Sequence, residues 1–169
     1  MPGERAGPSV FPRTNYPEVK PLVAGQMDWK HYHTSEEIEW WMQKWGKDYP
    51  DLVELYTVGK SFGNRDIWQL TLTNKKTGRH TDKPAAFFDG GRHSGEISGT
   101  ESAFYLMWHL LDQYGKDASI TKLLDTKTVY IRPVNNPDGS DMYRLTAQAN
   151  RSTVRPQDND GDGWGDQAR

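Results

Sequence analysis

The chain contains no cysteine, which excludes disulfide bonds and any zinc site with thiolate ligands. No apolar run approaches the roughly 18 residues that a membrane-spanning helix needs, and the first residues contain no secretory leader pattern. The formal net charge of −2 gives no electrostatic reason to expect binding to nucleic acid or to an anionic membrane. Any zinc site must therefore use histidine and carboxylate ligands.

Apolar residues are also scarce, at 34% of the 169 residues. Seven Trp, eight Tyr and five Phe compensate in part, because each aromatic side chain buries a large area. This composition is typical of a folded chain, and the length predicts one domain.

A helix is predicted over residues 34–50, since Ile38, Trp41, Met42 and Trp45 recur with the spacing of one helix face. Thr34 with Glu37 forms the pattern of a capping box at its start. Two strands are predicted over residues 51–61 and 65–74, joined by the turn "SFGN".

The apolar segment "AAFFDGG", residues 85–91, has the composition of a buried central strand. A second helix is predicted over residues 100–115 and a further strand over 125–134. The apolar face of that second helix would comprise Ala103, Leu106, Met107, Leu110 and Tyr114. This order predicts an α/β fold with a mixed sheet flanked by helices. From residue 135 onward we expect loops, and so long a structureless tail suggests that the chain covers about half of a fold.

Residues 90–100, "GGRHSGEISGT", place His93 and Glu96 between the predicted buried strand and the helix that follows. Ligands bind at this edge of open α/β sheets, and zinc accepts imidazole nitrogen and carboxylate oxygen. The H-x-x-E spacing alone is weak, because it recurs by chance. On this motif alone, a polar turn with Glu96 near a helix N-terminus is the simpler explanation.

Two more stretches carry chemistry-bearing residues. Asn136-Pro137-Asp138-Gly139 is a strong turn signal, and Arg151 and Arg155 follow it. An arginine near a zinc site could stabilise an oxyanion, although each is by default a solvated surface residue.

Taken together, "HYHTSEEI", "YPDLVELYTVGKSFGNRDIWQLTLT", "FFDGGRHSGEISGTES", "LLDQYGKD" and "IRPVNNPDG" resemble, in order and spacing, the zinc carboxypeptidase family (carboxypeptidase A-like) over residues 30–155. The resemblance implies a zinc site in which His93 and Glu96 are two of three ligands. It also implies that Arg151 polarises the scissile carbonyl, with Arg155 as its rival for this role. The implied fold is a mixed sheet of about eight strands with flanking helices.

The departures from this pattern concern the later part of the site. The family's third zinc ligand is a histidine well after the N-P-D-G turn, and the five histidines here (His31, His33, His80, His93 and His109) all precede that turn. The resemblance places the general base and the residues that grip the substrate carboxylate after that turn as well. The chain is therefore interpreted as an N-terminal half, and Gly95, where digestive members carry arginine, leaves the subsite preference open.

The acidic segment "DNDGDGWGD" places Asp158, Asp160, Asp162 and Asp166 at positions 1, 3, 5 and 9 of a calcium loop of the EF-hand type. Position 12, normally glutamate, is Arg169. Four carboxylates so close together would repel one another without a cation, and a solvated acidic loop is the alternative.

The sequence thus predicts an extended arm (residues 1–28), the N-terminal half of a zinc carboxypeptidase-like domain (29–155) and an acidic, potentially calcium-binding insertion (156–169). The predicted activity is zinc-dependent removal of C-terminal residues from peptides, with Zn²⁺ and Ca²⁺ as the expected ions. The alternatives are a zinc amidase or deacylase acting on cell-wall peptides or acylated amino acids, and an inactive calcium-dependent binding module. The family resemblance favours an extracellular or periplasmic location.

Overall fold

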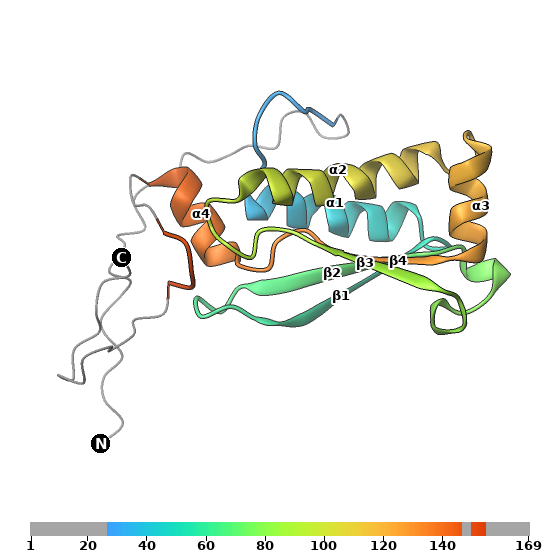
Figure 1. Ribbon diagram of the computed structural model, residues 1–169, viewed down its shortest axis with the longest axis horizontal. Coiled ribbons are helices and arrows are strands. Elements are labelled where there is room, and N and C mark those ends of the chain that lie inside the picture. The colour runs from blue at the N-terminus through green and yellow to red at the C-terminus, as the bar shows by residue number, and fades with distance from the viewer. Residues whose placement is uncertain (1–26, 147–149, 155–169) are drawn as a thin grey trace, which may run out of the picture. The chain divides into compact units, whose positions relative to one another are not determined.

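The computed structural model describes residues 27–146 and 150–154. The chain divides between Lys30 and His31, and the second unit contains every described helix and strand. These are α1 (Ser35–Asp48), β1 (Val53–Lys60), β2 (Asp66–Leu72), β3 (Ala85–Asp89), α2 (Ile97–Gln113), α3 (Ala118–Thr126), β4 (Thr128–Arg132) and α4 (Pro137–Leu145), with two short 3₁₀ turns, Lys75–Thr77 and His80–Asp82 (Figure 1).

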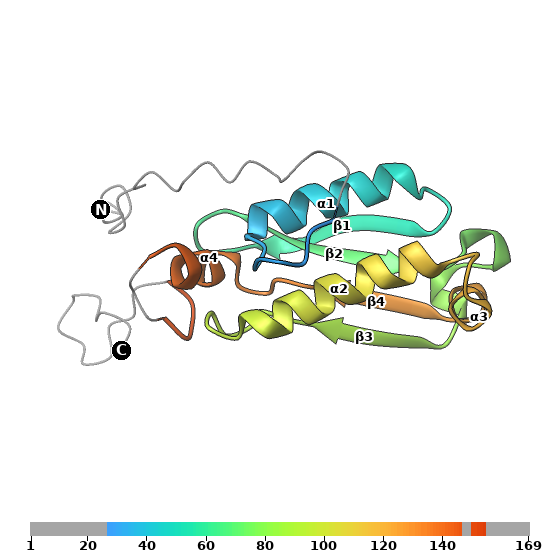
Figure 2. The ribbon, with the colours of Figure 1, turned by 90° about the horizontal axis from the view of Figure 1, so that it is seen from above.

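The strands form one mixed sheet in the order β1-β2-β4-β3. β1 and β2 are an antiparallel hairpin, β2 pairs antiparallel with β4, and β4 pairs parallel with β3. Helices α1 and α2 lie side by side on one face of this sheet (Figures 1 and 2). The predicted fold class, a mixed sheet flanked by helices, is confirmed.

The core lies between these two helices and the sheet. The predicted face of α1 is buried, and its capping box between Thr34 and Glu37 is present. On α2, Ala103, Met107 and Leu110 are buried as predicted, together with Phe104 and Leu111. Leu106 and Tyr114, which were expected on this apolar face, are only half-buried. The ring centroids of Trp45 and Phe104 lie 5.4 Å apart, which joins the two helices.

The prediction that residues 85–91 form a buried central strand is wrong for the part of the chain that the structure describes. Every residue of β3 is exposed, with Phe87 and Phe88 at 51% and 45%. Here β3 is an edge strand, paired only with β4. An apolar run indicates that residues tend to be buried, but it does not identify the segment that covers them.

The expectation of loops from residue 135 onward is also wrong, because Pro137–Leu145 is the helix α4. Asn136 caps its N-terminus through a hydrogen bond from the Gly139 amide, and Pro137 occupies its first turn. The buried side of α4 is unusually polar and includes Ser140 and Asp141. A search for apolar periodicity therefore misses it.

Helix α3 had no counterpart among the predicted elements. Its start is marked by Asp117, whose side chain accepts hydrogen bonds from the amides of Ser119 and Ile120. Among the described residues, no helix is long and apolar enough to cross a membrane.

Candidate metal centre

The candidate site lies where the parallel strands β3 and β4 end. Beyond the strands, hydrogen bonds from the Asn135 amide to the Gly90 carbonyl and from the Asn136 amide to the Gly91 carbonyl, both 3.0 Å, continue the contact. Parallel strands bring their carboxyl ends to the same edge of a sheet. The segment that holds His93 and Glu96 therefore runs beside the N-P-D-G turn.

Two glycines let the first turn of α2 approach this loop closely. A Cβ on Gly90 would lie 2.5 Å from the carbonyl oxygen of Gly99. Gly91 has φ +59°, and a Cβ there would lie 2.5 Å from Thr100 Oγ1. The double glycine after β3 is thus required by packing, and it fixes where the following His93 and Glu96 stand.

His93, Glu96 and Arg151 come together although Arg151 is more than fifty residues away in the sequence. His93 Nδ1 lies 3.0 Å from each carboxylate oxygen of Glu96. Arg151 Nη2 lies 3.3 Å from His93 Nδ1, and Arg151 Nη1 lies 3.5 Å from Glu96 Oε1. The three side chains are 40%, 54% and 70% exposed, so they form an open site.

These distances place conflicting demands on His93 Nδ1. As a donor it satisfies Glu96 but opposes the guanidinium of Arg151, and as an acceptor it satisfies Arg151 but faces the carboxylate. With a bare Nδ1, the imidazole nitrogen and the carboxylate present lone pairs to each other, an arrangement that a cation stabilises. Imidazole nitrogen and glutamate oxygen are ligands that zinc accepts, so these residues fit a zinc ion.

The alternative explanation of Glu96, an anion that favours a helix N-terminus, finds little support in its contacts. Glu96 occupies the N-cap position of α2, but its side chain accepts no hydrogen bond from the helix amides. Its carboxylate turns to His93 and Arg151 instead.

An ion pair borders the site at the end of β3. Arg92 Nη2 lies 2.8 Å from Asp89 Oδ2, which also accepts a 2.9 Å hydrogen bond from Asn135. The hydrogen bond from Arg92 is the main cause that holds the pKa of Asp89 below its ordinary value, with Asn135 acting in the same direction. Asp89 is therefore a permanent anion at neutral pH that links the ends of β3 and β4.

The N-P-D-G segment is more than a turn, since two of its side chains connect other parts of the chain. Asp138 accepts hydrogen bonds from Ser61 Oγ and the Gly63 amide, which fixes the β1–β2 hairpin against α4. Asn136 reaches toward Ser94 and Ser152. The sequence indicated only a turn at Asn136 and no role for Ser94, although an N-cap residue followed by Pro is a recognised helix start.

The other four histidines have contacts elsewhere. His33 is buried against Glu101, and His31 faces Glu37. His80 Nδ1 lies 2.8 Å from the hydroxyl of Tyr130, and the half-buried His109 stacks on Tyr105. Within the described ranges no group of three His, Asp or Glu residues gathers as a metal site. Arg155 and the acidic residues Asp158, Asp160, Asp162 and Asp166 lie outside those ranges.

Comparison with known sequences gives a consistent result. The sequence model of the zinc carboxypeptidase family matches residues 38–165. Carboxypeptidase A2 of Mus musculus is 38% identical over 120 residues, which cover 71% of this chain and 27% of that protein. Zinc carboxypeptidase A 1 of Anopheles gambiae is 34% identical over 127 residues, which cover 75% of this chain and 27% of that protein. The chain thus spans less than a third of the length of either relative.

Solved structures agree. Thrombin activatable fibrinolysis inhibitor superposes with a TM-score of 0.69 at 27% identity, over 80% of this chain and 33% of that chain. The carboxypeptidase A from Helicoverpa armigera shares the fold with a TM-score of 0.66 at 23% identity, over 74% of this chain and 29% of that chain. Since the family match covers most of the described residues and includes His93, Glu96 and Arg151, this chain belongs to the zinc carboxypeptidase family.

Proposed function

We propose that the protein is a zinc-dependent carboxypeptidase that hydrolyses the C-terminal peptide bond of peptides, and that His93 and Glu96 are two of its zinc ligands. One observation carries this proposal. His93 Nδ1 and both Glu96 oxygens face each other at 3.0 Å, and the cationic Arg151 is the next group. Membership of the family supplies the reaction class.

Each of the three residues has a distinct role in this proposal. When bound, zinc supplies Lewis-acid chemistry, polarising a carbonyl and making water more acidic. His93 and Glu96 hold the ion through the ligand types that it prefers. Arg151 donates hydrogen bonds to the oxygen of the scissile carbonyl as negative charge develops on it. Because Arg151 is 70% exposed, its guanidinium can turn from the ligands toward a substrate.

We propose that the third zinc ligand and the general base lie in protein beyond this chain. Catalytic zinc sites use three protein ligands, and the described residues bring only His93 and Glu96 together. The family relatives are more than three times as long as the matched segment, which leaves ample protein for the missing groups.

We propose in addition that the acidic segment of residues 158–166 binds calcium. The support is the spacing of its four aspartates, which present oxygen ligands in the order of a calcium loop.

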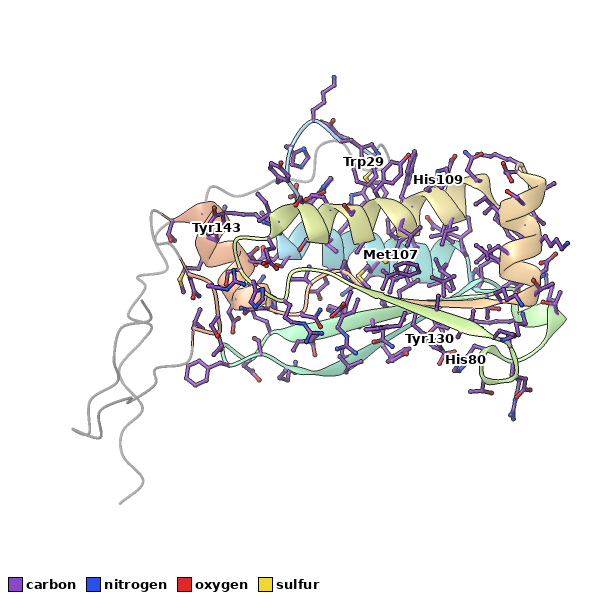
Figure 3. The ribbon with its side chains drawn as sticks, in the orientation of Figure 1. Trp29, His80, Met107, His109, Tyr130 and Tyr143 are labelled. Atoms are coloured by element: carbon purple, nitrogen blue, oxygen red, sulfur yellow. The ribbon has the colours of Figure 1, made fainter. Side chains whose placement is uncertain are left out.

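Zinc calorimetry on the complete protein tests the ligand assignment. His93→Ala and Glu96→Ala should each weaken zinc binding by at least about 100-fold, since even substitutions behind the ligands cost 10–100-fold. His109→Ala and His80→Ala are matched controls, because Figure 3 shows both histidines toward the end of the sheet away from Tyr143 of α4. Unchanged zinc affinity in both site variants would reject the assignment.

A further inference from the structure

A buried serine lies between the two candidate ligands and reaches a distant segment. Ser94 is fully buried, and its amide donates a 3.1 Å hydrogen bond to the Arg151 carbonyl. Its hydroxyl donates a second 3.1 Å bond to the Ser152 carbonyl. The loop that holds His93 and Glu96 is therefore fastened to the backbone of the segment that holds Arg151.

Asn136 reinforces the same contact from the end of β4. Its Nδ2 donates a 2.8 Å hydrogen bond to the Ser152 carbonyl and lies 3.3 Å from Ser94 Oγ. Its Oδ1 accepts the 3.0 Å bond from the Gly139 amide that caps α4. The single Asn136 side chain thus links the start of α4, Ser94 and residue 152. Figure 2 shows the segment of residues 150–154, in red, beside α4.

Gly139 leaves the space in which these groups meet. A Cβ at this position would lie 2.2 Å from Ser94 Oγ and 2.5 Å from Asn136 Nδ2. Both atoms are engaged in hydrogen bonds, so neither moves aside without losing a partner. The glycine of N-P-D-G and the serine of H-S-G-E are therefore packed against each other.

The position of Arg151 depends on this contact. Its side chain is 70% exposed and, among the described residues, its polar contacts are those of 3.3 and 3.5 Å to His93 and Glu96, which water competes for. Its backbone, in contrast, is held at two successive carbonyls by Ser94 and Asn136.

We propose that Ser94 and Asn136 are positioning residues that hold the Arg151 backbone, and through it the guanidinium, beside His93 and Glu96. The catalytic consequence rests on the proposed function, in which Arg151 stabilises the developing oxyanion. The positioning itself does not rest on the proposed function, because it follows from contacts within this chain. The two parts are tested by different measurements.

Trypsin cleavage after Arg151, in the zinc-free complete protein, measures the positioning directly. The Arg151 carbonyl belongs to the scissile bond and is held by Ser94, so cleavage requires local opening and follows the population of the open form. Asn136→Asp keeps the capping oxygen but turns the donor toward Ser152 into an acceptor. We expect about tenfold faster cleavage in Asn136→Asp and about fivefold in Ser94→Ala, which loses the hydroxyl's bond to the Ser152 carbonyl and its longer bond from Asn136 but keeps the bond from the Ser94 amide.

Matched controls separate positioning from general destabilisation. Asn64→Asp makes the same chemical change at an exposed turn residue, and Ser102→Ala removes an exposed hydroxyl on α2. Both should be cleaved after Arg151 at the wild-type rate. Cleavage after Arg79, an exposed arginine near the opposite end of β3, serves as the internal reference in every variant. If Asn136→Asp does not fold, Ser94→Ala carries the test alone.

Kinetics of the zinc-loaded complete enzyme test the catalytic consequence. Displacing Arg151 removes an interaction that strengthens in the transition state, so kcat should fall at least about tenfold in Asn136→Asp with KM little changed. Faster cleavage together with this lower kcat supports the proposal. Wild-type cleavage in both Asn136→Asp and Ser94→Ala, or faster cleavage with a wild-type kcat, overturns it. If His93→Ala and Glu96→Ala both leave zinc affinity unchanged, the proposed function fails while the cleavage result still decides the positioning.

Discussion

Asp141 is the residue of α4 whose removal should destabilise the protein most clearly. Its Oδ1 accepts hydrogen bonds from the Ser35 amide at 3.0 Å and from the Ser35 hydroxyl at 2.9 Å. Its Oδ2 forms a 2.6 Å ion pair with Arg65 Nη2. The buried carboxylate of Asp141 in α4 therefore contacts Ser35 at the start of α1 and Arg65, the residue before β2. The proposed change is Asp141→Ala.

The magnitude follows from what each partner loses. Hydrogen bonds to a charged group contribute about 1.5–3 kcal/mol each, and breaking a buried ion pair costs about 3–5 kcal/mol. The Arg65 side chain is 29% exposed and recovers water, so the ion pair counts at the low end. The Ser35 amide is a helix N-terminal donor with no intrahelical partner and would be left unsatisfied. These contributions overlap, because one carboxylate makes all the contacts and the cost of burying it disappears with it, so we expect Asp141→Ala to lower the free energy of unfolding by about 3 kcal/mol.

A neighbouring cation adds to this loss. Burial lowers the pKa of Arg144, and the negative charge of Asp141 is the first of the influences that oppose this. Without Asp141 the Arg144 guanidinium, whose nitrogens are buried and form no hydrogen bond among the described residues, loses a compensating charge.

Urea unfolding of the complete protein, followed by tryptophan fluorescence, measures the effect. Asp141→Asn keeps an acceptor for Ser35 and loses only the charge, so about 1–2 kcal/mol is expected. Asp112→Ala is the matched control, because Asp112 is 36% exposed and its pair with Lys116 should contribute under about 1 kcal/mol. If Asp141→Ala lowers the free energy of unfolding no more than Asp112→Ala does, the buried contacts of Asp141 do not stabilise the protein as proposed.

Three further predictions concern the metals and one acidic side chain. Residues 1–169 alone should release no C-terminal amino acid from blocked dipeptides, whereas a longer protein that contains the later segments should release it. If the two hydrolyse at comparable rates and His93→Ala abolishes the activity of residues 1–169, the proposal that later protein completes the site is wrong. Titration with calcium should change the fluorescence of Trp164, which lies inside the acidic segment, more than titration with magnesium does, and equal responses would favour a solvated loop. Hydrogen bonds from Asn74 and then Tyr114 lower the pKa of Asp125. Its carboxylate therefore stabilises the fold at pH values above its unfolded pKa of about 3.9, and this stabilisation is lost as the pH falls through the lower pKa of the folded state. The pKa of the Asp125 carboxyl in the folded protein, measured by NMR titration, should lie below about 3.9. A value at or above this would show that Asp125 does not stabilise the fold in this way.

Local patterns in the sequence predicted the elements that depend on local interactions. The capping box of Thr34 and Glu37 and the apolar spacing of α1 both involve residues within one or two turns, and both are present. The hairpin of β1 and β2 needs only a short turn between alternating segments. The H-x-x-E motif likewise placed His93 and Glu96 at the end of a strand, because the two residues are separated by one turn of chain.

Other features were decided by tertiary contacts. β3 is an edge strand in the described structure because only β4 pairs with it, which its own apolar residues do not encode. Helix α4 buries Asp141, and a buried carboxylate is tolerated only where partners such as Ser35 and Arg65 satisfy it.

The contact of Arg151 with His93 and Glu96 also depends on the tertiary structure. Ser94 and Asn136 lie 42 residues apart, and their contact exists because β3 and β4 are parallel neighbours whose carboxyl ends share one edge. The sequence by itself therefore determined α1, the β1–β2 hairpin and the closeness of His93 to Glu96. The parallel pairing of β3 and β4 is a long-range property of the sheet. It decided that Ser94 and Asn136 contact the backbone at Arg151 and Ser152, because residues so far apart in the chain meet only once the sheet has assembled.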